Sequence, residues 1–357
     1  MKVIYSLCSW GLGHATRSLP IIRRLLKENH ELTIISHDRS LQLLEKELEN
    51  TVSYIDIPDY PLLISENSRQ FIAKSMIYWP LFIKRIQSGL SQLSKILEKQ
   101  HCDCIISDGR YDMYSRHIPS FFISHQIRIL NPLRIKMLET GSETFNEFFF
   151  KRFNEIIIPD YQIDGFSGKL SHDLKKIDEK KLHYVGVLSD FNKKKMKKDI
   201  DYFISLSGPE PQRSILEEKI LSQIDNLDGS IVMTLGKTEE QNKTQSDSIK
   251  TYSYLSKEKR EELLNRSKMV ISRSGYSTIL DLSVIGCKAL MIPTPGQIEQ
   301  EYLAEYHKQK NTCYTVNQDL LNLKKDIVHT EKTTGFKAKR TVDDAVENVM
   351  QIISYSV

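Results

Sequence analysis

The sequence predicts two tandem α/β domains, each built on a mainly parallel sheet that helices cover on both faces. Two series of short apolar, β-rich runs alternate with helical periodicity, one in the first third of the chain and one after about residue 200. Strands buried on both faces of a parallel sheet have this continuous apolar character. The length of 357 residues exceeds the roughly 100 to 200 residues of one typical domain, so the chain has room for two cores.

The composition narrows the class of protein. At 40% hydrophobic and 27% charged residues it is that of an ordinary globular protein, and a net charge of +4 argues against nucleic acid as the principal partner. The five cysteines are scattered, which disfavours a disulfide framework or a zinc site and fits a reducing cytoplasm. No uncharged apolar run reaches about 18 residues and no signal-type segment opens the chain. We therefore expect a cytoplasmic protein that does not span a membrane.

The first series opens with a β-α-β unit. Apolar runs at 3–7 and 32–36 flank a segment whose apolar residues recur at spacings of 4, 3 and 4, the period of a helix. A long helical pattern covers 71–98. The remaining strands of this series are expected at 52–57, 104–107, 120–123 and 155–158.

The second series follows a Lys-rich stretch, 169–198, which contains ten lysines and four acidic residues. Its strands are expected at 202–206, 231–235, 249–252, 269–272, 289–292 and 312–315. We divide the chain into an N-terminal domain, a Lys-rich connection, a C-terminal domain and a terminal helix suited to packing back on the N-terminal domain. Their bounds are 1–168, 169–200, 201–340 and 341–357.

A short glycine loop follows the first strand, with the sequence Gly11-Leu12-Gly13-His14. Because Pro20 is favoured in the first turn of a helix, the helix is expected to begin at 16–18 and to leave His14 in the loop. The backbone at Gly13 then approaches a bound group closely, and His14 projects into the cleft that tandem α/β domains form. A tight turn with a hydrogen-bonded histidine is the structural alternative.

Three loops of the C-terminal series each join a strand to a helix. They contain Ser207-Gly208, Arg273-Ser274-Gly275 and 293–300. Backbone N–H groups and a helix N-terminus at such loops suit a diphosphate. Asp281, in the helix after the second loop, is placed to accept hydrogen bonds from a ribose diol, although a solvated carboxylate near a helix start is the simpler alternative.

The segment 269–304 resembles the donor-binding region of GT-B glycosyltransferases related to the bacterial peptidoglycan N-acetylglucosaminyltransferase, a family-28-like group. Asp281 stands where the family pattern has Glu, while Glu299 and Leu303 replace its His and Asn. The N-terminal loop ending at His14 is similar to the acceptor-side loop of the same group. The residues that match the donor pattern are Arg273, Ser274, Gly275, Thr278, Gly286, Pro293, Pro295, Gln300 and Ala304.

This resemblance implies a GT-B fold of two Rossmann-like domains. It implies an inverting transferase that moves a sugar, an N-acetylhexosamine, from a UDP-sugar to a hydroxyl of a lipid-linked or cell-surface glycan precursor. Uracil is then held by backbone near Tyr254 and Leu255, ribose by Asp281, and diphosphate by the loops. The donor-binding candidates are Gly13, Ser207, Gly208, Tyr254, Leu255, Arg273, Ser274, Gly275, Thr278, Asp281, Gln297 and Gln300.

The chemistry needs a base for the acceptor hydroxyl and stabilisation of the departing diphosphate. His14 is the first candidate base and Asp108 the second, because an imidazole titrates close to working pH. Helix N-termini can stabilise the leaving group, so we expect neither a metal nor another cofactor. The acceptor-side candidates are Arg17, Arg110, His125 and Gln126.

Two other functions use the same fold and stay open here: a sugar-nucleotide 2-epimerase and a non-catalytic nucleotide-sugar-binding subunit. The epimerase is disfavoured because the loop at 273–278 departs from an Asp-Ser-Gly-Gly type. Aromatic and basic residues mix at 71–85 and 145–153, as in helices that lie on an anionic membrane surface. Burial of these aromatic residues in the core is the equally simple alternative.

Overall fold

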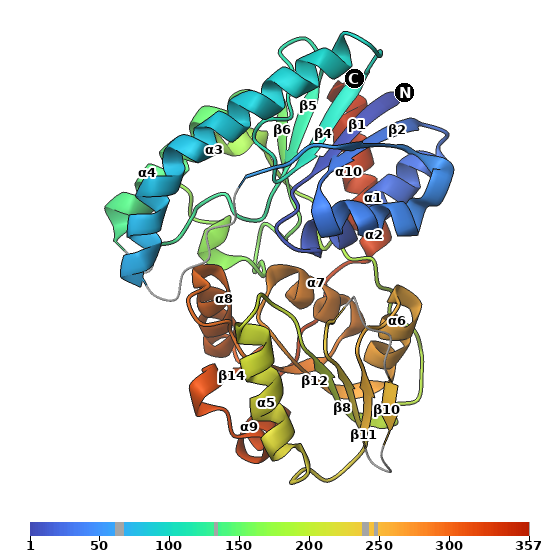
Figure 1. Ribbon diagram of the computed structural model, residues 1–357, viewed down its shortest axis with the longest axis vertical. Helices are drawn as coiled ribbons and strands as arrows, with labels where there is room; N and C mark the ends of the chain where they lie inside the picture. The colour runs from blue at the N-terminus through green and yellow to red at the C-terminus, as the bar shows by residue number, and fades with distance from the viewer. Residues whose placement is uncertain (61–67, 132–134, 238–242, 246–248, 357) are drawn as a thin grey trace. The chain divides into compact units, whose positions relative to one another are not determined.

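The computed structural model describes residues 1–60, 68–131, 135–237, 243–245 and 249–356, and the side chains of all of these except 68–77 and 243–245. The chain forms two compact units (Figure 1). Unit 1 comprises Met1–Asp190 with Arg340–Val357, and unit 2 comprises Phe191–Lys339.

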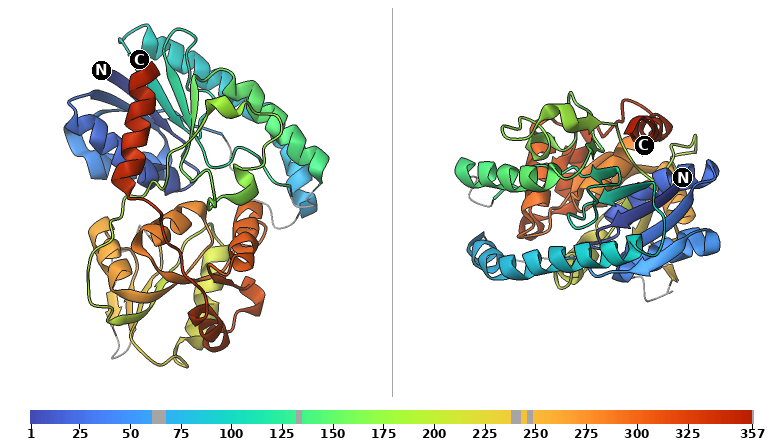
Figure 2. Two further views of the ribbon diagram at one scale, coloured as in Figure 1. Left: turned by 180° about the vertical axis from the view of Figure 1, so that it is seen from behind. Right: turned by 90° about the horizontal axis from the view of Figure 1, so that it is seen from above.

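Unit 1 is built on a seven-stranded parallel sheet in the order β3-β2-β1-β4-β5-β6-β7. Seen from above, its strands lie between α3 on one side and α10 on the other (Figure 2). Its strands are β1 (Lys2–Leu7), β2 (Glu31–Ser36), β3 (Ser53–Asp56), β4 (Cys104–Asp108), β5 (Ser120–Ile123), β6 (Glu155–Ile158) and β7 (Leu182–Tyr184). Its α-helices are α1 (Gly13–Lys27), α2 (Asp38–Leu48), α3 (Ser68–Leu97), α4 (Lys136–Phe150) and α10 (Val342–Ser356).

Unit 2 contains a second seven-stranded sheet in the order β10-β11-β9-β8-β12-β13-β14. All its neighbours are parallel except β10, which pairs antiparallel with β11. The strands are β8 (Ile200–Ser205), β9 (Ile231–Thr234), β10 (Lys243–Gln245), β11 (Ile249–Tyr252), β12 (Ser267–Ser272), β13 (Lys288–Met291) and β14 (Tyr314–Thr315). The α-helices are α5 (Gln212–Ile224), α6 (Lys257–Arg266), α7 (Tyr276–Ile285), α8 (Ile298–Gln309) and α9 (Leu323–Glu331). The α/β fold class expected from the alternating pattern is therefore confirmed.

The boundary between the units lies at Asp190 and Phe191, inside the range 169–200 that the composition assigned to a connection. Two interactions tie the first part of that range into unit 1. The strand β7 extends the sheet beside β6, and the buried Glu143 of α4 accepts hydrogen bonds from the backbone N–H groups of Lys175 (2.7 Å) and Lys176 (3.1 Å). A three-residue strand is too short to leave a periodic signal in the sequence.

The helix α10 packs within unit 1 against α1. Its buried face includes Ala345, Val349 and Ile353, and Arg24 of α1 pairs with Glu347 at 2.9 Å. Figure 2 shows the helix running beside the strands.

The start of α1 differs from the sequence expectation. The helix begins at Gly13, and Thr16 N–H closes its first turn by donating to Leu12 C=O at 2.9 Å, so His14 lies in the first turn and not in the loop. Pro20 consequently sits in the helix interior, where it supplies no N–H for a backbone hydrogen bond. Burial of the neighbouring Leu19 and Ile22 against the sheet outweighs this cost.

The aromatic residues of the two suspected interfacial stretches divide between core and surface. Phe149, Phe150 and Phe153 are buried, as burial alone would explain, whereas Phe148 is 58% and Trp79 48% exposed. The side chains at 71–77 lie outside the described residues. No helix in the described part of the chain is long and apolar enough to cross a membrane.

Candidate active site

The sheet of unit 1 reverses its direction of growth at β1. From β1 the chain adds β2 on one side, and it later adds β4 on the other. Loops that leave the carboxyl ends of two such strands diverge, and open α/β sheets bind ligands in the crevice between them. His14 follows β1 and Asp108 ends β4, so the two candidate bases meet at this point.

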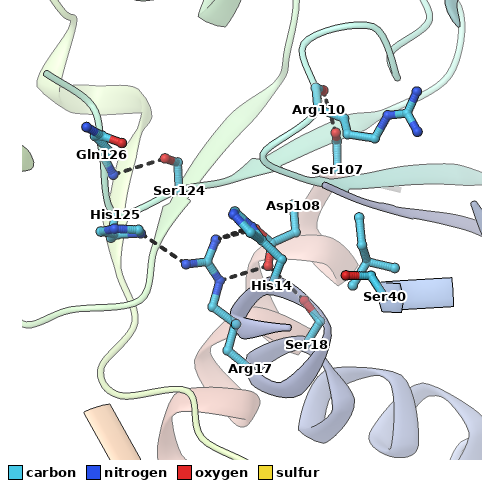
Figure 3. A network of polar contacts seen from close by, with 12 residues as sticks. His14, Arg17, Ser18, Ser40, Ser107, Asp108, Arg110, Ser124, His125 and Gln126 are labelled. Carbon is cyan, nitrogen blue, oxygen red and sulfur yellow. Dashed lines mark hydrogen bonds and ion pairs between the residues drawn. The ribbon is translucent and has the colours of Figure 1, made fainter. Parts of the chain in front are cut away.

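Asp108 is the centre of a polar network (Figure 3). Its carboxylate is fully buried and accepts hydrogen bonds from Arg17 Nε (2.9 Å), Ser18 Oγ (2.8 Å) and His14 Nδ1 (2.7 Å), and Arg17 Nη2 donates to it as well. Burial by itself raises the pKa of Asp108, but the charge of Arg17 and the hydrogen bonds from His14 and Arg17 outweigh burial and hold that pKa well below its usual value. Asp108 is therefore an anion that does not accept protons at neutral pH.

The contact with Asp108 determines the tautomer of His14. A proton must lie between Nδ1 and the carboxylate oxygen at 2.7 Å, and the ionised Asp108 has none to give. Arg17 Nη2 also lies 2.9 Å from Nδ1, but it has its own acceptor in Asp108. The imidazole thus carries its proton on Nδ1 and leaves the lone pair of Nε2 available, with 21% of the side chain exposed.

Arg17 and His125 support this pair from behind. Arg17 is 2% exposed, and its Nη1 donates to His125 Nδ1 at 3.0 Å, because a guanidinium can only donate. Gly109 leaves room for the imidazole of His14. Its φ of +77° favours glycine, and a Cβ at this position would lie 2.9 Å from His14 Cε1. A side chain at position 109 would therefore displace the imidazole.

Two of the residues expected on the acceptor side have structural contacts instead. Arg110 is fully buried, pairs with Asp112 at 2.7 Å and donates to Ile57 C=O at 2.7 Å, so its guanidinium makes structural contacts within unit 1. Arg17, as described, is likewise enclosed by its partners. Gln126 is half-buried, and its backbone N–H donates to Ser124 Oγ at 3.0 Å.

The loop before α1 is held by residues that sequence analysis did not single out. Ser9 donates to Asp59 through both its backbone N–H (2.5 Å) and its hydroxyl (2.8 Å), and the indole N–H of Trp10 donates to Tyr60 C=O at 2.7 Å. Ser40 Oγ donates to Gly11 C=O at 3.1 Å. These partners lie 29 to 50 residues from the loop in the sequence, so no local sequence pattern predicts the contacts.

In unit 2 the sheet reverses its growth at β8, with β9 on one side and β12 on the other. Arg273, directly after β12, is 1% exposed and donates to Gln212 C=O (2.7 Å), Pro293 C=O (3.2 Å) and Gln318 Oε1 (2.6 Å). Desolvation lowers its pKa to about 10, so it remains a cation at neutral pH. Arg273 therefore connects three segments of unit 2, and a direct contact between its side chain and the donor stays a prediction.

The loops after β12 and β13 are connected to each other. Ser274 Oγ donates to Gln300 C=O (2.8 Å), and Thr294 N–H donates to Gln300 Oε1 (2.9 Å). Gly275 is the N-cap of α7, whose first-turn N–H groups have no partner within the helix, and Gly286 ends this helix with φ +81°. Helix N-termini with free first-turn N–H groups are able to bind anions.

The other donor candidates differ in accessibility. Ser207 and Gly208 are exposed, and Gly208 has φ +113°. Leu255 is 7% exposed, so only its backbone suits a ligand contact. Half-buried positions are occupied by Gly13, Tyr254, Gly275, Thr278, Asp281, Gln297 and Gln300.

Comparison with known proteins agrees with this architecture. Residues 212–349 match the glycosyltransferase family 28 C-terminal domain, and residues 1–124 match a glycosyl transferase family 1 domain. The chain is 24% identical over 317 residues to an uncharacterized glycosyltransferase of Methanosarcina mazei, which covers 84% of this chain and 82% of the relative.

Solved structures resemble the fold over almost the whole chain. The glycotransferase of kitacinnamycin superposes with a TM-score of 0.63 at 13% identity, covering 99% of this chain and 95% of that one. A putative UDP-N-acetylglucosamine 2-epimerase from Listeria monocytogenes gives 0.63 at 12% identity (99% and 96%). MurG of Acinetobacter baumannii gives 0.56 at 10% identity (99% and 100%).

These findings define the class of protein: the fold is GT-B. The protein is a glycosyltransferase whose C-terminal domain resembles that of family 28, and the family resemblance expected from the sequence is confirmed.

Proposed function

We propose that the protein transfers a sugar from a UDP-sugar to an acceptor hydroxyl with inversion, and that His14 is the general base. The observation that carries this proposal is the His14–Asp108 pair at the switch point of unit 1, with Nε2 of an oriented imidazole available. A general base contributes typically about 10² to 10⁴ in rate. Asp108, the second candidate base, becomes a positioning residue, because a buried anion with four hydrogen bonds does not take up a proton at neutral pH.

The reaction is a single displacement. The acceptor oxygen forms a bond to the anomeric carbon, the bond from that carbon to the diphosphate oxygen breaks, and the acceptor proton moves to His14 Nε2. The imidazolium that forms is stabilised by the ionised Asp108 at 2.7 Å. The first-turn N–H groups of α7 and the buried charge of Arg273 favour the diphosphate that leaves.

The donor is assigned as a UDP-sugar, with an N-acetylhexosamine as the sugar. Asp281 in α7 is half-buried and close enough in sequence to the Gly275 N-cap for a ribose diol and a diphosphate to be held by one helix. The family 28 match over 212–349 favours transfer over the epimerase reaction, although an epimerase shares the fold.

The acceptor is assigned as a glycan precursor presented at an anionic membrane surface, with the protein peripheral on the cytoplasmic side. Support comes from the exposed apolar side chains of α3 and α4, among them Trp79 and Phe148. Basic residues lie nearby in sequence, such as Arg85, Lys136 and Lys151, all exposed. An interfacial helix combines these two kinds of side chain. Binding to vesicles containing anionic lipid, lost in Trp79→Ser with Phe148→Ser, tests the location.

One incubation separates the candidate functions. Radiolabelled UDP-N-acetylhexosamine is offered with a lipid-linked acceptor pool. Label in the acceptor with release of UDP supports the transferase, a changed sugar nucleotide without transfer supports the epimerase, and binding without either supports a non-catalytic subunit. Because helix N-termini take the role of a metal at the diphosphate, turnover should survive a chelator.

A further inference from the structure

The arginines of unit 2 fall into two groups. The unit contains four of them: Arg213, Arg260, Arg266 and Arg273. Arg213 pairs with Glu217 at 2.6 Å and with Glu210, and Arg266 pairs with Asp199 at 2.8 Å and with Glu262 at 2.6 Å. Among the described residues, no carboxylate pairs with Arg260 or Arg273.

The two arginines without a carboxylate partner lie at the ends of neighbouring strands. Arg260, in the first turn of α6, directs Nη2 at Ser205 Oγ (3.4 Å), the last residue of β8. Arg273 follows Ser272, the last residue of β12, and Ser205 and Ser272 are register partners. Both arginines therefore converge on the β8–β12 switch point, where a parallel α/β sheet binds its ligand.

Unsatisfied buried groups mark the same place. The Nε atoms of Arg260 and Arg273 and the hydroxyl of Thr294 are buried without a hydrogen-bond partner in the part of the chain described. Two of these atoms adjoin Gly208: a Cβ there would lie 3.6 Å from Thr294 Oγ1 and 3.9 Å from Arg273 Nε. Leaving buried polar groups unpaired is costly, so such a cluster is expected where a ligand or water completes the bonding.

We propose that Arg260 is a donor-binding residue that contacts a phosphate of the nucleotide sugar, with Arg273 supplying a second positive charge from beneath. This inference rests on the proposed function, since it assigns a further residue to the same donor. Arg273 is 1% exposed, so it acts on a ligand through its positive charge and by holding the loops in position. Arg260 is only half-buried, so its side chain can contact a ligand directly.

The contacts that Arg260 makes within the fold are weak. Its guanidinium lies 5.8 Å from the centroid of the Phe191 ring, near the outer limit for a cation–π interaction, and its hydrogen bond to Ser205 is long. An anionic ligand would supply the charge partner that the described residues do not. A phosphate accepts a charge-assisted hydrogen bond from a guanidinium with favourable geometry.

Calorimetric titration of uridine, UMP and UDP into the full chain tests the assignment. The variants are Arg260→Gln, Arg260→Lys and, as a matched control, Arg266→Gln, which removes a paired arginine from the same helix. We expect Arg260→Gln to weaken UDP binding about 10- to 100-fold, the range for a hydrogen bond to a charged group, with uridine binding unchanged. Arg260→Lys should recover part of this loss, and Arg266→Gln should bind all three ligands like the wild type.

The outcomes separate the inference from the function on which it rests. If the wild type binds neither UDP nor another nucleoside diphosphate, the proposed function fails. If the wild type binds UDP and Arg260→Gln binds it equally well, the role of Arg260 is overturned. An equal loss for uridine and UDP would also overturn it, because the side chain would then serve the nucleoside or the fold. Thermal melting of each variant shows whether it folds.

Discussion

Removing the imidazole of His14 is the most demanding test of the site. In His14→Ala we expect turnover to fall about 10³- to 10⁴-fold, the upper part of the range for a general base, which corresponds to roughly 4 to 5.5 kcal/mol on the barrier. The upper part is expected because a fully buried, ionised Asp108 stabilises the imidazolium at 2.7 Å. The affinity for UDP should stay nearly unchanged, since all the donor candidates except Gly13 lie in unit 2.

The assay measures steady-state transfer and, separately, UDP affinity by calorimetry. A matched control is His183→Ala, which removes a histidine that also pairs with a carboxylate, Glu155 at 2.7 Å, but lies in the edge strand β7. Asp108→Asn extends the test. An amide N–H facing Nδ1 would make that nitrogen an acceptor and move the imidazole proton to Nε2, so turnover should fall although His14 is present.

Three results would refute the reasoning. Turnover in His14→Ala within a few-fold of the wild type would leave His14 a structural residue. Loss of UDP affinity in the same variant would make it a donor ligand. A covalent glycosyl-enzyme adduct, detected by mass spectrometry, would exclude the single displacement.

Substitutions at Asp108, Gly89 and Asp281 test three other parts of the reasoning. The pKa of Asp108 is depressed in the folded state, so its contribution to the free energy of unfolding is complete at neutral pH. This contribution should be lost as the pH falls from about 5 through the depressed pKa. Asp108→Asn should lack this component of acid unfolding, and an acid transition identical to that of the wild type would contradict the prediction. Gly89→Ala should lower the free energy of unfolding by about 1 to 3 kcal/mol, because its Cβ would lie 1.7 Å from Asp112 Oδ2. The control Gly141→Ala, whose Cβ would have no neighbour within 4 Å, should leave the free energy of unfolding unchanged or raise it. Denaturant titration measures both variants. Asp281→Ala should weaken UDP binding by about 1.5 to 3 kcal/mol, and unchanged affinity in calorimetry would remove Asp281 from the ribose site.

Much of the geometry of the candidate donor loops in unit 2 could be predicted from local sequence. The strand-to-helix loops after β8, β12 and β13 carry their signals within a few residues: glycines at positions such as Gly208 and Gly286, and a small polar segment before the apolar helix α7. A parallel sheet then brings the carboxyl ends of all its strands to one edge, so their convergence follows from topology alone.

Burial could not be predicted in the same way. Arg273 is a donor candidate because it matches the family pattern, and Arg110 is an acceptor-side candidate because it follows a strand end. Both side chains are buried and donate to the backbone and side chains of other segments. The helix α1 begins before the position that Pro20 favours, since packing against the sheet decides its first residue. No local sequence pattern indicates the burial of these arginines or the first residue of α1.

The sequence by itself determined two mainly parallel sheets, their glycine loops and the family resemblance, because these depend on periodicity and on spacing within short segments. Only the tertiary structure shows how the two candidate bases, His14 and Asp108, lie relative to each other. Asp108 lies about 90 residues from its partners Arg17 and Ser18, and their contact turns one carboxylate into a buried anion and one imidazole into an oriented acceptor. A pKa and a tautomer depend on neighbours in space, and the fold alone supplies those neighbours.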